Sequence, residues 1–123
     1  PDNFLFVTGK DGSEEIKLTD WEYAGMQDPH LDVAMFIIYA MYDRDSAEKL
    51  IDLYFSDGCD KATRLKIYCY IAVSGLVWSN WCEFKRHCGV EFGAYAQRQY
   101  DYAREYTKIF FKEYREVFGR DYV

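Results

Sequence analysis

The sequence has little that would suggest a membrane or a nucleic-acid partner. Its apolar runs, such as VAMFIIYAM, are far shorter than the ~20 residues that span a bilayer, and no basic-then-apolar signal segment stands at its start. The net charge is -6, and the Lys and Arg residues form no stripe that could follow a phosphate backbone. We therefore expect no membrane span and no nucleic-acid binding.

Paired cysteine motifs are also missing. The cysteines show no CxxC spacing, and a domain of 123 residues does not need disulfides to hold its core. Adjacent His87 and Cys88 cannot easily both face one ion from a helix, so a zinc site with Cys82 is not expected. Reduced thiols and a cytoplasmic location are predicted.

Aromatic residues, in contrast, are abundant. Tyr, Phe and Trp make up 20% of the chain, and half of all residues are apolar, which excludes a disordered tail. The length corresponds to one domain, and no repeat, low-complexity tract or linker divides residues 1–123. We expect one domain folded around aromatic rings.

The order of the segments predicts a mainly α fold that begins with a β-hairpin. NFLFV and IKLTDWEY read as strands, and TGKDGSEE between them reads as a turn. Apolar residues then recur at helical spacing over about 29–42, 45–55, 60–87 and 91–118, with Ser46 or Asp45 as the cap of the second segment. A hairpin followed by four helices is the predicted fold.

Two polar residues stand at the outer ends of the predicted strands. If Val7 pairs with Ile16, then Asn3 lies opposite Asp20; a slip of one residue would pair Phe6 with Ile16 instead, and the sequence leaves both registers open. Amide and carboxylate oxygens are hard ligands, and Mg²⁺ needs few of them because water and phosphate complete its shell. Asn3 and Asp20 are therefore candidate ligands of Mg²⁺.

Asn3 and Asp20 each stand in a short motif, and a third motif follows them. PDN, LTDWEY and DPHLDVA, in this order, resemble the choline and ethanolamine kinases of the aminoglycoside-phosphotransferase-like superfamily, whose members share the C-terminal lobe of protein kinases. The resemblance implies that Asn3 and Asp20 hold Mg²⁺ for the co-substrate ATP and that Asp32 braces the catalytic loop.

The same resemblance implies that parts of the family's machinery lie outside these 123 residues. PDN is similar to the last three positions of the catalytic loop, so the catalytic base is expected before Pro1, together with an N-terminal nucleotide lobe. We therefore expect the chain to be the substrate-binding lobe of such an enzyme and to have no kinase activity by itself. An exposed docking face for the missing lobe would also favour self-association.

A pair of tryptophans suggests the substrate. Trp78 and Trp81 are three residues apart and share one face of a helix, where two indole rings can contact a single cation. The stretch also resembles the Trp-x-x-Trp segment of choline kinases, which implies a pocket with Tyr23, Phe92 and Tyr95 as further faces. Glu22 is a candidate partner of the cation, whereas Tyr39 and Tyr42 line the same pocket or pack in the core, and we favour packing.

The predicted function is transfer of the γ-phosphoryl group of ATP to choline, giving phosphocholine, in the full enzyme. A kinase for ethanolamine, thiamine or another amino alcohol is the first alternative, although a primary ammonium needs hydrogen-bond acceptors rather than rings. The second alternative is a non-catalytic helical binding module that reuses this lobe.

Overall fold

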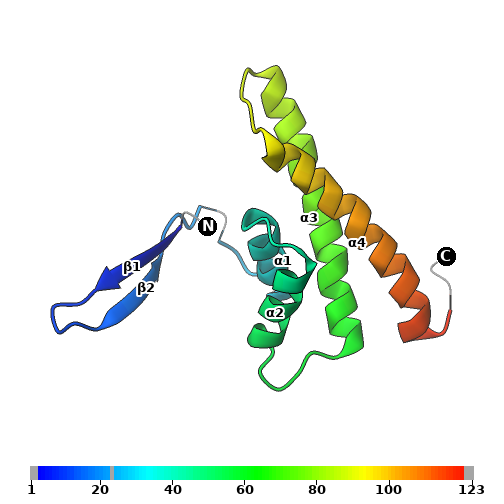
Figure 1. Cartoon of the computed structure of the whole chain (residues 1–123), viewed down its shortest axis with the longest axis horizontal. Helices are drawn as coiled ribbons and strands as arrows, with labels where there is room; N and C mark the ends of the chain where they lie inside the picture. The colour runs from blue at the N-terminus through cyan, green and yellow to red at the C-terminus, as the bar shows by residue number, and fades with distance from the viewer. Residues whose placement is uncertain (1–2, 23, 121–123) are drawn as a thin grey trace.

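The computed structural model describes residues 3–22 and 24–120. In this part of the chain an antiparallel hairpin precedes four helices, which confirms the predicted mainly α fold. Figure 1 shows the hairpin projecting to one side of the helices, while the last two helices form a long pair that extends beyond the first two. The elements are β1 (Phe4–Thr8), β2 (Glu14–Leu18), α1 (His30–Tyr39), α2 (Arg44–Tyr54), α3 (Lys61–His87) and α4 (Ala94–Phe118).

Aspartate side chains define where two helices begin. Asp43 accepts a hydrogen bond from the Ser46 backbone N–H (2.9 Å) and caps α2, and Asp60 caps α3 in the same way. The predicted cap of α2, Ser46 or Asp45, is wrong: Ser46 is the donor in this cap, and Asp45 lies inside the first turn, where its carboxylate favours the helix dipole.

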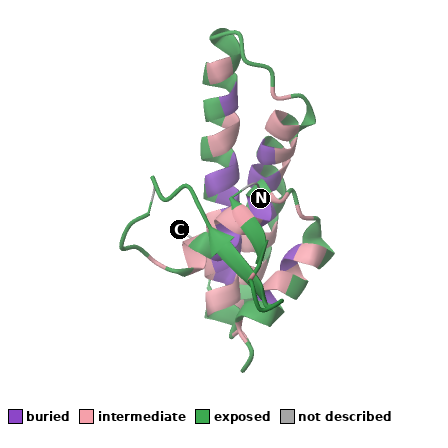
Figure 2. Ribbon diagram, turned by 90° about the vertical axis from the view of Figure 1, so that its left-hand side faces the viewer, coloured by how far each residue is buried: buried purple, intermediate pink, exposed green. Residues whose placement is uncertain are grey.

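The core lies where α1 and α2 meet the lower half of the α3–α4 pair. Figure 2 shows the buried positions concentrated on the facing sides of these helices. Gly75 allows α3 and α4 to cross closely, because a Cβ atom there would lie 2.7 Å from the Gln99 carbonyl oxygen and 2.9 Å from the Tyr102 Cβ. The largest buried apolar side chains are Tyr68, Tyr102, Tyr106, Ile37, Ile38, Ile51, Leu65, Ile67 and Ile71.

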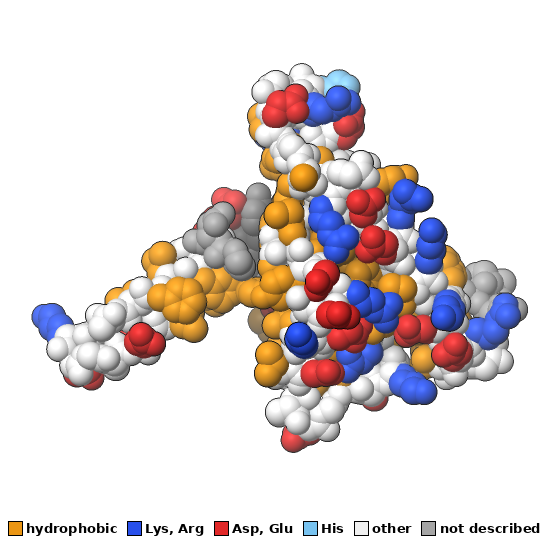
Figure 3. Space-filling model, in the orientation of Figure 1, with side chains coloured by type: hydrophobic (Ala, Val, Ile, Leu, Met, Phe, Trp, Pro, Cys, Tyr) orange, Lys and Arg blue, Asp and Glu red, His pale blue; other side chains and the backbone are white. Residues whose placement is uncertain are grey.

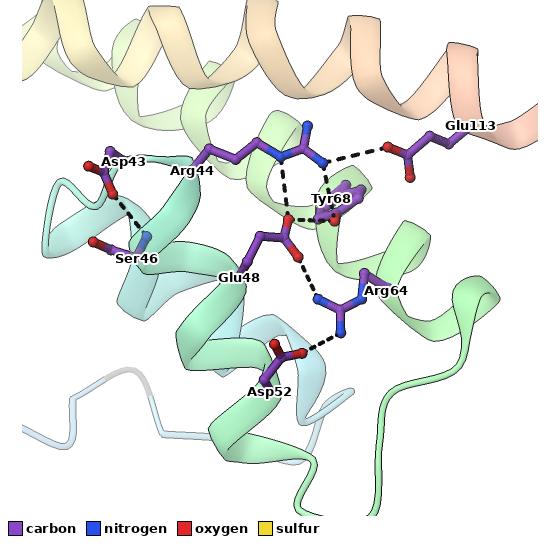
Figure 4. A network of polar contacts seen from close by, with 8 residues as sticks. All are labelled: Asp43, Arg44, Ser46, Glu48, Asp52, Arg64, Tyr68 and Glu113. Carbon is purple, nitrogen blue, oxygen red and sulfur yellow. Dashed lines mark hydrogen bonds and ion pairs between the residues drawn. The ribbon is translucent and has the colours of Figure 1, made fainter.

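A polar network joins α2 to the two long helices (Figure 4). Glu48 accepts hydrogen bonds from Tyr68 and Arg64, and the Arg64 guanidinium also contacts Asp52 at 2.6 Å. Arg44 lies between Glu48 (3.4 Å) and Glu113 (3.5 Å). Every charged member has an opposite charge beside it, so we assign the network to the packing of α2.

Of the two hairpin registers that the sequence leaves open, the structure has the one that pairs Phe6 with Ile16. Phe6 pairs with Ile16 and Phe4 with Leu18, so Asn3 lies opposite Thr19 rather than Asp20. Both faces of the ribbon are largely exposed, so burial does not select a register. The turn does: the Gly9 N–H donates to the Ser13 carbonyl oxygen (2.7 Å) and closes a loop that fixes the pairing.

The surface differs between the hairpin and the helices. In Figure 3 acidic and basic side chains gather over the helical part, whereas the hairpin shows apolar side chains along much of its length. Phe6 is 81% exposed, and in the hairpin only Phe4 makes a described ring contact with the helices, to Phe36 at 5.5 Å. Among the described residues, no helix is long and apolar enough to cross a membrane.

Candidate functional site

Asn3 and Asp20 lie at neighbouring strand ends. The Asn3 carbonyl oxygen accepts a hydrogen bond from the Thr19 N–H (3.0 Å), and Asp20 is the next residue. Both side chains are exposed. An amide and a carboxylate in such a position have the donor chemistry that a hydrated Mg²⁺ accepts, so the residues present fit the predicted ion.

Asp20 has a backbone conformation that the sequence did not reveal. Its φ is 62°, in the left-handed region that non-glycine residues seldom occupy, although Asp tolerates it better than most. Such backbone outliers cluster at functional sites. The neighbouring Trp21 donates its indole N–H to the Leu18 carbonyl oxygen (3.0 Å) and closes the turn after β2.

Asp28 holds the segment between β2 and α1 against α3. Its carboxylate accepts hydrogen bonds from the Lys66 ammonium (2.7 Å) and the Tyr70 hydroxyl (3.1 Å), and also from the His30 backbone N–H. The hydrogen bond from Lys66, followed by that from His30, lowers the pKa of Asp28 to about 2. The sequence does not reveal these contacts with Lys66 and Tyr70, although Asp28 opens the motif DPHLDVA.

Asp32, the predicted brace of the catalytic loop, lies in the first turn of α1 with an exposed side chain. Within residues 3–22 and 24–120, no hydrogen bond or ion pair involves its carboxylate. Its position suits the helix dipole, because carboxylates stabilise helix N-termini. The bracing role stays a prediction.

The structure brings five aromatic side chains together, and we call them the ring cluster: Tyr39, Trp78, Trp81, Phe92 and Tyr95. The Trp78 and Trp81 centroids are 5.2 Å apart with planes at 81°, and Trp81 lies 5.2 Å from Phe92. Tyr39 of α1 extends the series to Trp78 at 5.3 Å, and Tyr95 of α4 extends it to Phe92 at 6.5 Å. Residues from three helices and a loop thus form one continuous surface.

Two other predicted site residues, Tyr23 and Glu22, are not part of the ring cluster as the structure describes it. Tyr23 lies outside the described residues. Glu22 is exposed in the segment after β2, and no contact in the described part of the chain joins it to the ring cluster. The cation-partner role of Glu22 stays a prediction.

Exposure varies along the ring cluster. Trp81 is 40% exposed and Tyr39 is 43% exposed, whereas Trp78, Phe92 and Tyr95 are half-buried. Burial raises the pKa of Tyr95 to about 12, so its hydroxyl is neutral at physiological pH. The cluster therefore offers solvent-accessible aromatic surface backed by half-buried rings. The preference for Tyr39 as a packing residue holds in part, because its ring packs on Trp78 while remaining exposed.

Side chains of α4 fix the C-terminal end of α1 and hence the position of Tyr39. Gln99 is fully buried and donates to the Ile38 carbonyl oxygen (2.9 Å), and Arg98 donates to the Tyr42 carbonyl oxygen (2.9 Å). The Tyr102 hydroxyl also donates to Tyr42. Sequence reasoning missed these residues because their partners are backbone atoms about 60 positions away, which no pattern reveals.

A cavity of about 340 Å³ lies beside the ring cluster, between the end of α3 and the start of α4. Phe92 is the only ring-cluster member in its lining, and Glu83 and Glu91 supply carboxylates. The Glu83 carboxylate already binds Arg86 at 2.6 and 3.0 Å. The cavity is thus separate from the two tryptophans, and we base no function on it.

Comparison with known proteins gives a relative in one organism. The chain is 28% identical to Protein LicA of Haemophilus influenzae (strain ATCC 51907 / DSM 11121 / KW20 / Rd) over 115 residues, which cover 84% of this chain and 39% of that protein. A second Protein LicA of Haemophilus influenzae is also 28% identical, with 84% of this chain and 31% of that protein covered. The chain spans about a third of the length of these curated relatives.

No family model matches the sequence, and no solved structure matches it. The similarity to LicA covers the region that contains most of the predicted site residues, because it takes in 84% of the chain. Because no solved structure matches, the description of the fold and of the ring cluster rests on the present structure alone.

Proposed function

We propose that this chain supplies the substrate-binding surface and two metal ligands of a choline kinase-like phosphotransferase. The observation that carries the proposal is the ring cluster, in which the Trp81 centroid lies 5.2 Å from both Trp78 and Phe92 while Trp81 stays accessible. The chain spans about a third of the length of the LicA relatives. Phosphoryl transfer is therefore proposed for a longer protein that includes this chain, and not for the 123 residues alone.

The chemistry of the cluster suits a quaternary ammonium. A trimethylammonium group has no N–H to donate, so it binds by packing its methyl groups against aromatic faces, with about 0.5 to 2 kcal/mol from each good ring. The rings would hold the ammonium end of choline and leave its hydroxyl end free to be directed towards the phosphate donor.

The strand ends are the second part of the proposal. Asn3 and Asp20 would hold Mg²⁺, which when bound with ATP offsets the negative charge of the phosphates. Asp28 supports this arrangement from a distance, because its bonds to Lys66 and Tyr70 tie the segment after β2 to α3, the helix that carries both tryptophans.

Calorimetric titration of the chain with choline and with ethanolamine tests the substrate. We expect choline to bind more tightly, and Trp81→Ala to weaken choline binding by about 2- to 30-fold, since one cation–π contact is lost. Phe84→Ala is the matched control: Phe84 lies on the same helix, is 64% exposed and makes no described ring contact with the cluster.

The alternatives appear as distinct outcomes of this titration. Tighter binding of ethanolamine than of choline would favour another amino-alcohol kinase. Absence of binding by either ligand would contradict the proposal and leave the non-catalytic helical module.

A further inference from the structure

The ring cluster already has a cation beside it. The Lys85 ammonium lies over the Trp81 ring, with Nζ 5.7 Å from the ring centroid. This distance is within the range of about 6 Å over which an ammonium is attracted to an aromatic face. Lys85 follows Trp81 by four residues on α3, so the two side chains lie on the same side of the helix.

The Lys85 ammonium has no carboxylate partner in the described part of the chain. The nearby Glu83 carboxylate is held by Arg86 in a two-point contact and lies 3.8 Å from His87. None of the ion pairs among residues 3–22 and 24–120 includes Lys85. Lys85 is half-buried, and its ammonium is thus a positive charge without a carboxylate partner at the edge of a surface proposed to bind a positive ligand.

Trp81 is 40% exposed, and Lys85 lies beside the surface that it offers to a ligand. The Trp78 and Phe92 rings each lie 5.2 Å from its centroid, tilted at 81° and 58°, and Lys85 covers a face of the indole. A ligand ammonium that uses this face must displace Lys85, because two cations cannot share it without repulsion.

We propose that Lys85 is an internal cation that competes with the ligand ammonium for Trp81 and thereby limits the affinity of the ring cluster for choline. The proposal rests on the proposed function, since it assigns an affinity-determining residue to the same site. Lys85 touches the ring and not the reacting atoms, so it regulates binding without taking part in phosphoryl transfer.

The first test is calorimetric titration with choline at low salt. Lys85→Met removes the charge and keeps most of the stem, and we expect it to tighten choline binding by about 2- to 10-fold. Lys85→Arg keeps a cation over the ring and should bind choline as the unchanged chain does. Lys61→Met is the matched control, because it removes the same charge from the first turn of the same helix and should leave affinity unchanged.

The second test observes the contact directly by NMR. In the free protein the ε-methylene signal of Lys85 should be shifted upfield from those of the other lysines by the indole ring, and its absence from Lys85→Met assigns it. Saturating choline should move the signal back towards the others as the side chain leaves the ring.

The outcomes separate the two proposals. If choline binds but Lys85→Met binds it equally or more weakly, and the Lys85 signal stays in place, the competition is wrong and the proposed function stands. If the Lys85 signal is shifted in the free protein but choline binds none of the variants, the proposed function is wrong. The proposal that Lys85 competes with choline for Trp81 is then wrong as well.

Discussion

The β-hairpin and the α3–α4 pair are both made of two antiparallel segments joined by a short loop, yet they are stabilised differently. The helices bury Tyr102 and Tyr106 and approach closely at Gly75. The hairpin leaves both faces exposed, and its geometry depends on backbone hydrogen bonds and on the turn from Gly9 to Ser13. Side-chain packing thus determines the geometry of the helix pair, whereas the hydrogen bonds of the turn determine the geometry of the hairpin.

Enlarging Gly75 should have the largest effect. Gly75→Val places atoms where the Gln99 carbonyl oxygen and the Tyr102 Cβ already lie within 3 Å of a Cβ position, so we expect a loss of about 3 kcal/mol in the free energy of unfolding. Urea denaturation followed by circular dichroism measures it. Gly25→Val, at a glycine with nothing within 4 Å of a Cβ, is the control. Equal stability of the two variants would show that the helices do not cross as described.

Asp28 should give a smaller effect that depends on pH. Its folded-state pKa of about 2 lies below the usual value for Asp, so its contribution to stability is complete above about pH 5 and is lost as the pH falls towards 2. Asp28→Asn should therefore be less stable than the unchanged chain at pH 6, and the difference should shrink at pH 3. Thermal denaturation at the two pH values measures this. A difference independent of pH would contradict the assigned role of Lys66.

Changing the hairpin surface should have the smallest effect. Phe6→Ser removes a ring that is 81% exposed, so we expect the free energy of unfolding of the helices to change by less than about 0.5 kcal/mol. The same urea denaturation measures it. Phe4→Ser, which removes the 5.5 Å contact with Phe36, should cost more. A loss above about 1 kcal/mol for Phe6→Ser would mean that this face is covered in solution.

The contrast between the two regions also explains which features the sequence predicts. The four helices follow from apolar spacing because each has a buried face that imposes it, and Trp78 and Trp81 share a face for the same reason. The hairpin register could not be chosen from apolar residues, because Phe6 and Ile16 are exposed in the pairing that forms.

Other features of the site have no signal in the sequence. Gln99 acts on a backbone carbonyl of α1, and Lys85 reads as an ordinary charged residue at the end of a helix. Their roles depend on which segments meet in space. The metal-ligand roles of Asn3 and Asp20 stay predictions, carried by their donor chemistry and by the unusual backbone of Asp20.

The close crossing at Gly75 has a consequence for how the ring surface could change over evolution. Trp81 lies six residues beyond the crossing, about 9 Å along the helix axis. A change of about 10° in the angle between α3 and α4 would therefore displace the indole by about 1.5 Å relative to Phe92 and Tyr95. If α3 and α4 rotated about this crossing, a single substitution at Gly75 would widen or narrow the ring surface. Ligand size could then be tuned without replacing any aromatic residue.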